Sequence, residues 1–127
     1  MPPAAPLITD LAAAPALVAW LADEPVEIAE ALYLDPKWRL CGRQRFVGGL
    51  DAVTLPVRQL VVAGFVAGAH YVVMAHNHPS GDPEPSDADL IFTRRLADTL
   101  LLLEMPLADH LIVTRTATMS FKQRGLL

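Results

Sequence analysis

The chain has 127 residues, of which 53% are hydrophobic and 19% are charged, and its formal net charge is −4. This length and composition suit one compact domain with a hydrophobic core, and they exclude a disordered tail. The acidic balance argues against a general nucleic-acid coat and against a protein that binds anionic membranes. The longest apolar span, residues 60–75, is also shorter than the ~20 residues that a membrane helix needs.

The N-terminus is apolar and rich in alanine, but it has no basic segment and Asp10 interrupts it, so we expect no export signal and a cytoplasmic protein. The single cysteine, Cys41, excludes an intrachain disulfide and a cysteine-based zinc site, and we expect it to be a small buried or half-buried residue. A basic group is expected to form a solvated strand edge. Its members are Lys37, Arg39, Arg43 and Arg45.

The first half of the chain predicts a short helix, two strands and a second helix. Thr9 or Asp10 can cap the short helix, and residues 26–35 form an apolar strand that ends at an Asp-Pro turn. Residues 38–47 alternate between polar and apolar, which predicts a strand antiparallel to the first. Pro56 then begins a helix that continues to about residue 68. The apolar residues expected to pack inward from the two helices are Leu11, Leu17, Val18, Leu21, Leu60, Val61, Phe65 and Val66.

The second half predicts a buried strand, a long helix and two closing strands. The wholly apolar run YVVMA at 71–75 is typical of a strand buried on both faces. Ser86 begins a helix to about residue 104, and residues 110–115 and 118–121 form the last strands. The residues expected to face inward from this helix are Leu90, Thr93, Ala97, Leu100 and Leu101. The order predicts an α/β fold with a mixed sheet sandwiched by helices, formed by a tail and short helix at 1–22 and one domain at 23–127.

Residues 75–92, AHNHPSGDPEPSDADLIF, concentrate side chains that can bind a metal directly after the buried strand. His76 and His78 are two positions apart, so in extended backbone both rings point the same way. Pro79 favours that extended backbone at His78. Asp89 lies in the first turn of the following helix, from which its carboxylate can reach back toward the two histidines. This spacing indicates a site made of two imidazoles and one carboxylate.

Such a set leaves one tetrahedral position open, as catalytic zinc sites do. A water in that position has its pKa lowered to about 7, and a further carboxylate must take and return its proton. A simpler interpretation stays open, because Ser86 and Asp89 also have the spacing of a helix capping box, which needs no metal. The remaining polar residues of this kind are expected to be structural or to solvate the loop. They are His70, His110, Asp82 and Glu84.

The whole pattern, His76-x-His78, seven residues, Ser86, two residues and Asp89, closely resembles the metal-binding signature of the JAB/MPN (JAMM) metallopeptidases. HNHPSGDPEPS followed by TRRL is similar to the bacterial RadC-type branch, as are LYLD at 32–35 and DHLIV at 109–113. The resemblance runs from about residue 24 to residue 121. It implies the JAB/MPN (cytidine deaminase-like) architecture.

The resemblance also implies roles for individual residues. His76, His78 and Asp89 match zinc ligands, and Ser86 matches the serine whose hydroxyl holds the substrate carbonyl or the oxyanion. The general base of the family lies on the first strand, eight residues before the aspartate that ends it. Counting back from Asp35 gives Glu27. Glu24 and Glu30 are nearby competitors that strand parity does not exclude.

The implied activity is that of a zinc-dependent metallopeptidase or isopeptidase, which hydrolyses an amide bond of a peptide or protein substrate. The alternative is a non-catalytic, metal-binding interaction or regulatory module, associated with DNA repair by family name only. Asn77 stands where eukaryotic JAMM proteins tend to have Ser or Thr. Zinc-dependent deamination of a nucleobase is excluded, because its motif needs two cysteines beyond the histidine. A homo-oligomer is possible.

Overall fold

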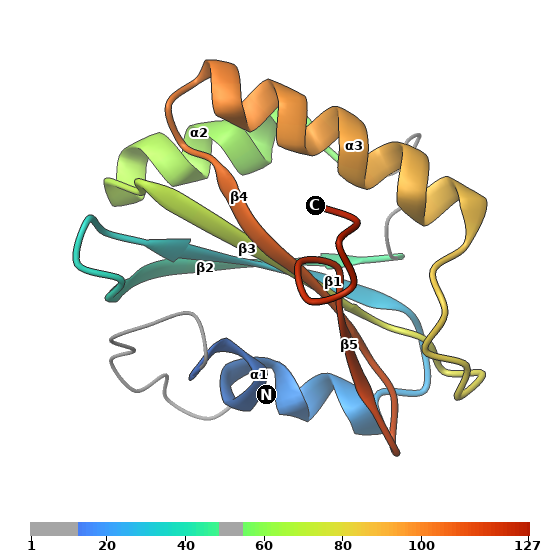
Figure 1. Ribbon diagram of the computed structural model, residues 1–127. Coiled ribbons are helices and arrows are strands. Elements are labelled where there is room, and N and C mark those ends of the chain that lie inside the picture. Colours follow the sequence, from blue (N-terminus) through green and yellow to red (C-terminus); the bar gives the residue numbers. More distant parts are fainter. Residues whose placement is uncertain (1–12, 49–54) are drawn as a thin grey trace.

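The computed structural model describes residues 13–48 and 55–127 (Figure 1). The helical elements are α1 (Ala14–Val18), the 3-10 helix η2 (Ala19–Asp23), α2 (Val57–Ala67) and α3 (Asp87–Leu102). The strands are β1 (Ile28–Leu34), β2 (Leu40–Val47), β3 (Tyr71–Asn77), β4 (Leu107–Val113) and β5 (Thr118–Ser120). The predicted element order is confirmed. The predicted caps Thr9 and Asp10, together with Leu11, lie outside the described residues.

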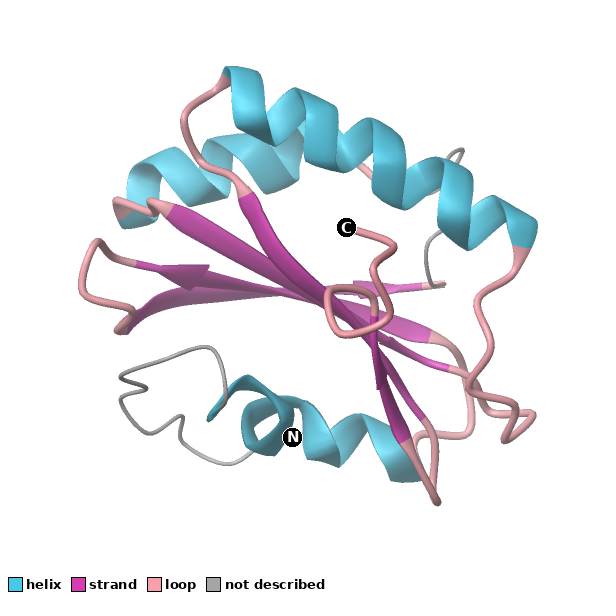
Figure 2. Cartoon of the chain, viewed as in Figure 1, coloured by secondary structure: helices cyan, strands magenta, loops and turns pink. Residues whose placement is uncertain are grey.

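The five strands form one mixed sheet in the order β2-β1-β3-β4-β5. β1 is antiparallel to both β2 and β3, whereas β3 and β4 are parallel and β5 returns antiparallel to β4. The parallel pair is joined by α3, which crosses over the sheet as such pairs require (Figure 2). β3 therefore lies at the centre of the sheet, which explains its unbroken apolar sequence.

Helices cover both faces of the sheet, with α2 and α3 on one side and α1 with η2 on the other (Figure 1). Each interface has its own apolar cluster. The α2 and α3 side includes Tyr33, Leu60, Met74 and Leu100, and the opposite side includes Leu17, Leu21, Leu32 and Val73. The predicted α/β fold, a mixed sheet between helices, is confirmed, and it is consistent with the JAB/MPN architecture.

The phase of the two long helices differs from the prediction. In α2, Leu60 is buried, but Phe65 and Val66 are 54% and 84% exposed, and Gly64 faces the sheet instead. In α3, Leu90 and Leu101 are exposed, and Phe92 and Leu96 are buried in their place. Both helices are apolar on more than one face, so their sequence periodicity does not determine which face meets the sheet.

Two expectations about β2 were also wrong. Cys41 is exposed, because β2 is an edge strand with one face open to solvent. Arg43 does not belong to a solvated edge. Its guanidinium turns inward and lies 2.6 Å from the carboxylate of Glu30, which is 2% exposed. A buried carboxylate needs such a partner.

Among the described residues, no helix combines the length and the apolar character needed to cross a membrane.

Candidate metal centre

The register of β1 and β3 brings the loop histidines to the start of β1. Ala29 pairs with His76 in this antiparallel ladder. Continuing the register past the two strand ends places Glu27 opposite His78. His76 is the penultimate residue of β3, because the strand continues two residues beyond the end predicted at residue 75, and His78 follows the strand end. Two segments far apart in the chain therefore meet at one edge, where the Ile28 amide binds Asn77 across 49 positions.

Three electron-pair donors converge at this edge. Nε2 of His76 lies 3.0 Å from Nε2 of His78. Oδ2 of Asp89 lies 3.1 Å from Nε2 of His78 and 3.4 Å from Nε2 of His76. When Glu27 is included, the ligand atoms of all four residues lie within 4.8 Å of one another. The sequence-predicted ligands and the predicted base are thus brought together in one group that could hold a metal ion.

The spacing of the three donors suits a tetrahedral cation. Bonds of about 2.0–2.1 Å to nitrogen and oxygen place neighbouring ligand atoms about 3.3 Å apart, which is close to the three separations observed. Nδ1 of His78 lies 2.8 Å from the main-chain carbonyl oxygen of Asp82. Because a carbonyl can only accept, Nδ1 carries the hydrogen and Nε2 of neutral His78 keeps its lone pair. The donor set therefore fits a divalent metal.

Asp89 owes its position to the start of α3. The Ser86 hydroxyl accepts a hydrogen bond from the Asp89 amide at 3.0 Å, and the Ser86 amide donates to Oδ2 of Asp89 at 2.9 Å. Burial raises the pKa of Asp89, but the neighbouring His76 ring and the hydrogen bonds from Ser86 outweigh it and hold the pKa well below its usual range. The capping box and the metal group are therefore not alternatives. The cap holds the carboxylate ionised and aimed at the histidines.

The three candidate glutamates have separate environments. Glu27 precedes β1 by one residue and is a member of the four-residue group. Glu30 is bound by Arg43 and by Nε1 of Trp20, at 2.6 Å and 3.3 Å, on the side of the sheet covered by α1. The group that could hold a metal does not include Glu24. Geometry thus distinguishes the three where strand parity could not.

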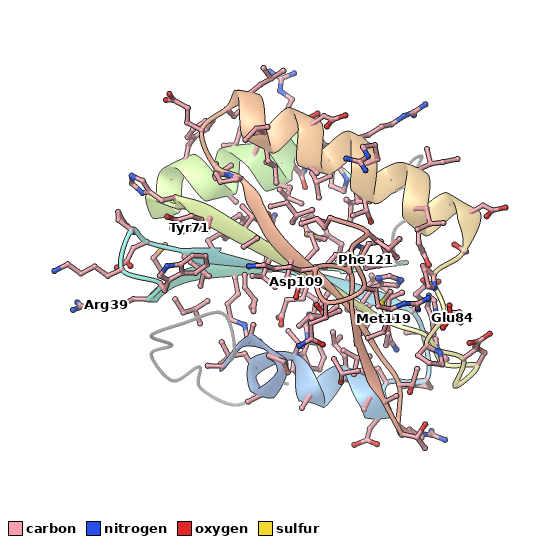
Figure 3. All side chains as sticks on the ribbon, viewed as in Figure 1. Arg39, Tyr71, Glu84, Asp109, Met119 and Phe121 are labelled. Atoms are coloured by element: carbon pink, nitrogen blue, oxygen red, sulfur yellow. The ribbon has the colours of Figure 1, made fainter. Side chains whose placement is uncertain are left out.

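Ser86 lies beside the group on a surface hollow of about 500 Å³. Its hydroxyl oxygen already accepts from the Asp89 amide, so its own hydrogen stays available to a ligand in the hollow. The lining residues are Glu27, His78, Pro79, Ser80, Asp82, Glu84, Pro85, Ser86 and Asp89, and the loop that carries Glu84 is visible in Figure 3. A second hollow of about 530 Å³ shares His78, Pro79 and Ser80 and adds Glu24 and Arg115. The donor set is therefore reachable from solvent.

Asn77 is a positioning residue that sequence reasoning noted only as a departure. Its side chain is 2% exposed and points away from the two neighbouring histidines. Oδ1 accepts from the Ile28 amide at 2.7 Å, and Nδ2 donates to the carbonyl oxygens of Val26 and Glu24 at 2.9 Å and 3.2 Å. Asn77 therefore fixes the main chain on both sides of Glu27. The sequence signal for this role was the alternation of side chains in His76-Asn77-His78, which turns Asn77 to the opposite face of the strand from the two histidines.

His110, expected to be structural and without clustered ligands nearby, lies directly behind the group. Its Nε2 is 2.8 Å from Nδ1 of His76, and its ring stacks on Phe121 at a centroid distance of 4.6 Å. Burial, and then the positive charge that His76 can carry, lower the pKa of His110 well below its usual value. His110 is thus neutral at pH 7. No local sequence pattern connects it to residue 76, because the contact depends on the parallel pairing of β3 and β4. His70, by contrast, is exposed at the opposite end of β3.

Comparison of the sequence with known proteins identifies the family of the chain. A family model described as the RadC-like JAB domain matches residues 8–126. A UPF0758 protein of Bordetella avium is 41% identical over 109 residues, which cover 84% of this chain and 48% of that protein. A UPF0758 protein of Neisseria meningitidis is 40% identical over 108 residues, with the same two coverages. One from Nitrosococcus oceani is 40% identical over 112 residues, or 87% and 50%.

The chain therefore spans about half the length of these relatives, whose names state no activity. The family model covers nearly all of it, including every residue of the candidate metal centre. The JAB fold, the four-residue group and the sequence match agree. This chain belongs to the RadC-like JAB family.

Proposed function

We propose that the chain is a zinc-dependent hydrolase of peptide-type amide bonds, with His76, His78 and Asp89 as the metal ligands. The observation that carries this proposal is the convergence of the three donor atoms at separations of 3.0–3.4 Å. Two nitrogens and one oxygen suit zinc, and they leave a fourth position open toward the hollow. Zinc bound there supplies a Lewis acid that polarises a water and the substrate carbonyl.

Glu27 acts as the general base in this proposal. Its carboxylate belongs to the same group but comes from the residue just before β1, whereas the three proposed ligands come from β3, the loop and α3. It takes the proton from the attacking water and gives it to the nitrogen of the leaving amine. General acid–base catalysis of this kind contributes about 10²–10⁴ to the rate.

Ser86 stabilises the developing negative charge on the substrate oxygen. Its hydroxyl has a free hydrogen and borders the hollow beside Asp89. A preorganised hydrogen-bond donor at such a position stabilises the transition state by about 3–4 kcal/mol. The proposed substrate is a peptide or protein, and two surface hollows that share His78, Pro79 and Ser80 beside the metal group support this substrate class.

The test is hydrolysis of a peptide library by the zinc-loaded chain, in parallel with a panel of peptides joined through lysine side chains. Cleavage by the wild type that is lost in Glu27→Gln supports the proposal, and the better-cleaved panel shows whether the bond is an ordinary or an isopeptide amide. Equal cleavage by the wild type and Glu27→Gln would contradict it. Zinc binding without any hydrolysis would instead identify a non-catalytic metal-binding module.

A further inference from the structure

A row of three buried side chains runs behind the ligand atoms, from β3 through β4 to α3. Nδ1 of His76 lies 2.8 Å from Nε2 of His110, and Nδ1 of His110 lies 2.6 Å from the hydroxyl oxygen of Thr93. His76 and His110 are completely buried and Thr93 is 2% exposed. Solvent does not compete for these contacts, so each ring nitrogen must use the partner that it has here.

The positions of the hydrogens along this row are coupled. A neutral imidazole has one nitrogen that donates and one that accepts. His76 can offer the lone pair of Nε2 only when its hydrogen is on Nδ1. The Nδ1–H of His76 then donates a hydrogen bond to Nε2 of His110. His110 must therefore carry its own hydrogen on Nδ1 and donate it to the Thr93 oxygen. Only this arrangement of hydrogens lets His76 bind a metal through Nε2, and in it the Thr93 oxygen is the last hydrogen-bond acceptor.

His76 differs from His78 in this respect. The partner of His78 is a main-chain carbonyl, which can only accept, so its tautomer is fixed locally. The partner of His76 is a ring nitrogen, which can accept or donate. If the Thr93 hydroxyl donated instead, both hydrogens would shift, and Nε2 of His76 would carry a hydrogen in place of a lone pair. The direction of the hydrogen bond between His110 and Thr93 is therefore linked to the tautomer of His76.

We propose that Thr93 and His110 are positioning residues of the metal centre, which hold His76 in the tautomer whose Nε2 lone pair faces His78 and Asp89. This inference rests on the metal-binding part of the proposed function. A metal-bound histidine commonly donates its other N–H to a carboxylate or a carbonyl, and such partners tune metal affinity. Here a neutral histidine takes that place, so no further negative charge is added beside Asp89 and Glu27.

The fold keeps this row in register with the ligands. Thr93 lies four residues after Asp89 on α3, so both face the sheet from the same side of the helix, and both are buried. The cap that orients Asp89 therefore also fixes the position of Thr93, one helical turn further along α3. On the other side, the Phe121 ring, labelled in Figure 3, lies almost parallel to the ring of His110, at an interplanar angle of 13°. His110 is thus fixed in both plane and position.

The test compares zinc affinities, measured by competition with a chelator, for folded variants of the full chain. Thr93→Val removes the acceptor at nearly constant volume and is expected to weaken zinc binding about 10-fold, whereas Thr93→Ser stays within about threefold of the wild type. His110→Leu is expected to weaken it about 100-fold, and His110→Gln, whose side-chain oxygen can accept from His76, to recover part of this loss. Thr99→Val, the same change at an exposed site of α3, is the matched control and leaves affinity unchanged.

Zinc affinities of Thr93→Val and Thr93→Ser that equal that of the wild type would overturn the positioning role and leave the proposed function intact. A wild type that binds zinc no more tightly than His76→Ala would instead contradict the metal centre itself. Nitrogen-15 NMR of the zinc-loaded wild type gives a second readout that does not depend on mutation. We expect His76 and His110 both to carry their hydrogen on Nδ1, and a hydrogen on Nε2 of His110 would overturn the inference.

Discussion

The candidate centre has two sides that are held in different ways. On the ligand side, side-chain hydrogen bonds fix His76, His78 and Asp89 through His110, the Asp82 carbonyl and Ser86. On the base side, Glu27 is placed through its main chain. Asn77 binds the amide that follows it, and the Glu27 carbonyl accepts from Gly48 at 3.0 Å. From this difference we predict that mutations can separate the proposed metal binding from the proposed proton transfer.

The sharpest use of this comparison is Glu27→Gln, which keeps the shape of the side chain and removes its basicity. We expect amide hydrolysis to fall by about 10²–10⁴. Zinc affinity should stay close to that of the wild type, because the three ligands belong to the other side. Rate constants and chelator competition on the same preparations measure the two effects. A parallel loss of zinc would show that Glu27 is a ligand and would break the distinction.

Ser86 lies where the two sides meet, because it caps α3 and also borders the hollow. Ser86→Ala removes the proposed oxyanion donor and should lower kcat by about 10²–10³. It also removes the helix cap, which should reduce the free energy of unfolding by about 1 kcal/mol in the metal-free protein. Ser86→Asp restores a cap without a hydroxyl donor. We expect it to recover stability but not kcat, and recovery of both would refute the catalytic role.

A third experiment separates the centre from the general stability of the fold. Arg43→Met leaves the buried carboxylate of Glu30 without its main partner and should cost about 3 kcal/mol of unfolding free energy. The double variant Glu30→Gln/Arg43→Met should regain most of this loss, as urea unfolding will measure. Zinc affinity of both folded variants should match the wild type. A loss of zinc in either would mean that the two faces of the sheet are coupled.

The smallest expected change is at Asn77, where the base side is anchored. Asn77→Asp keeps the acceptor for the Ile28 amide but places a carboxylate oxygen against the carbonyls of Glu24 and Val26. We expect a loss of about 2 kcal/mol in unfolding free energy. Hydrolysis should decline more than zinc affinity, because the main chain around Glu27 is displaced first. A larger effect on zinc affinity would contradict this order.

Local patterns were sufficient for most of the fold and for the donor set. The central strand, the His-x-His spacing and the capped start of α3 all depend on neighbours within a few residues, so sequence reasoning identified them. The burial phase of α2 and α3 was wrong because Phe65, Val66 and Leu101 are apolar yet face solvent. Apolar periodicity alone does not identify the face that packs on the sheet.

The parts of the site that escaped prediction depend on contacts between distant segments. The pairing of His110 with His76 follows from the parallel register of β3 and β4, and the hydrogen bonds of Asn77 reach back across about 50 residues. The separation of Glu27, the proposed base, from Glu24 and Glu30 likewise required the register of β1 against β3 and the position of Arg43. The spacing of residues along the chain does not reveal which distant residues become these partners.

The central claim is best tested by the metal content of the purified chain after loading with zinc and removal of the excess. The wild type should retain one zinc per chain, His78→Ala should retain none, and His70→Ala, which changes an exposed histidine at the far end of β3, should retain one. An undiminished one-to-one zinc content in His78→Ala would contradict the ligand set, and with it the proposed hydrolase.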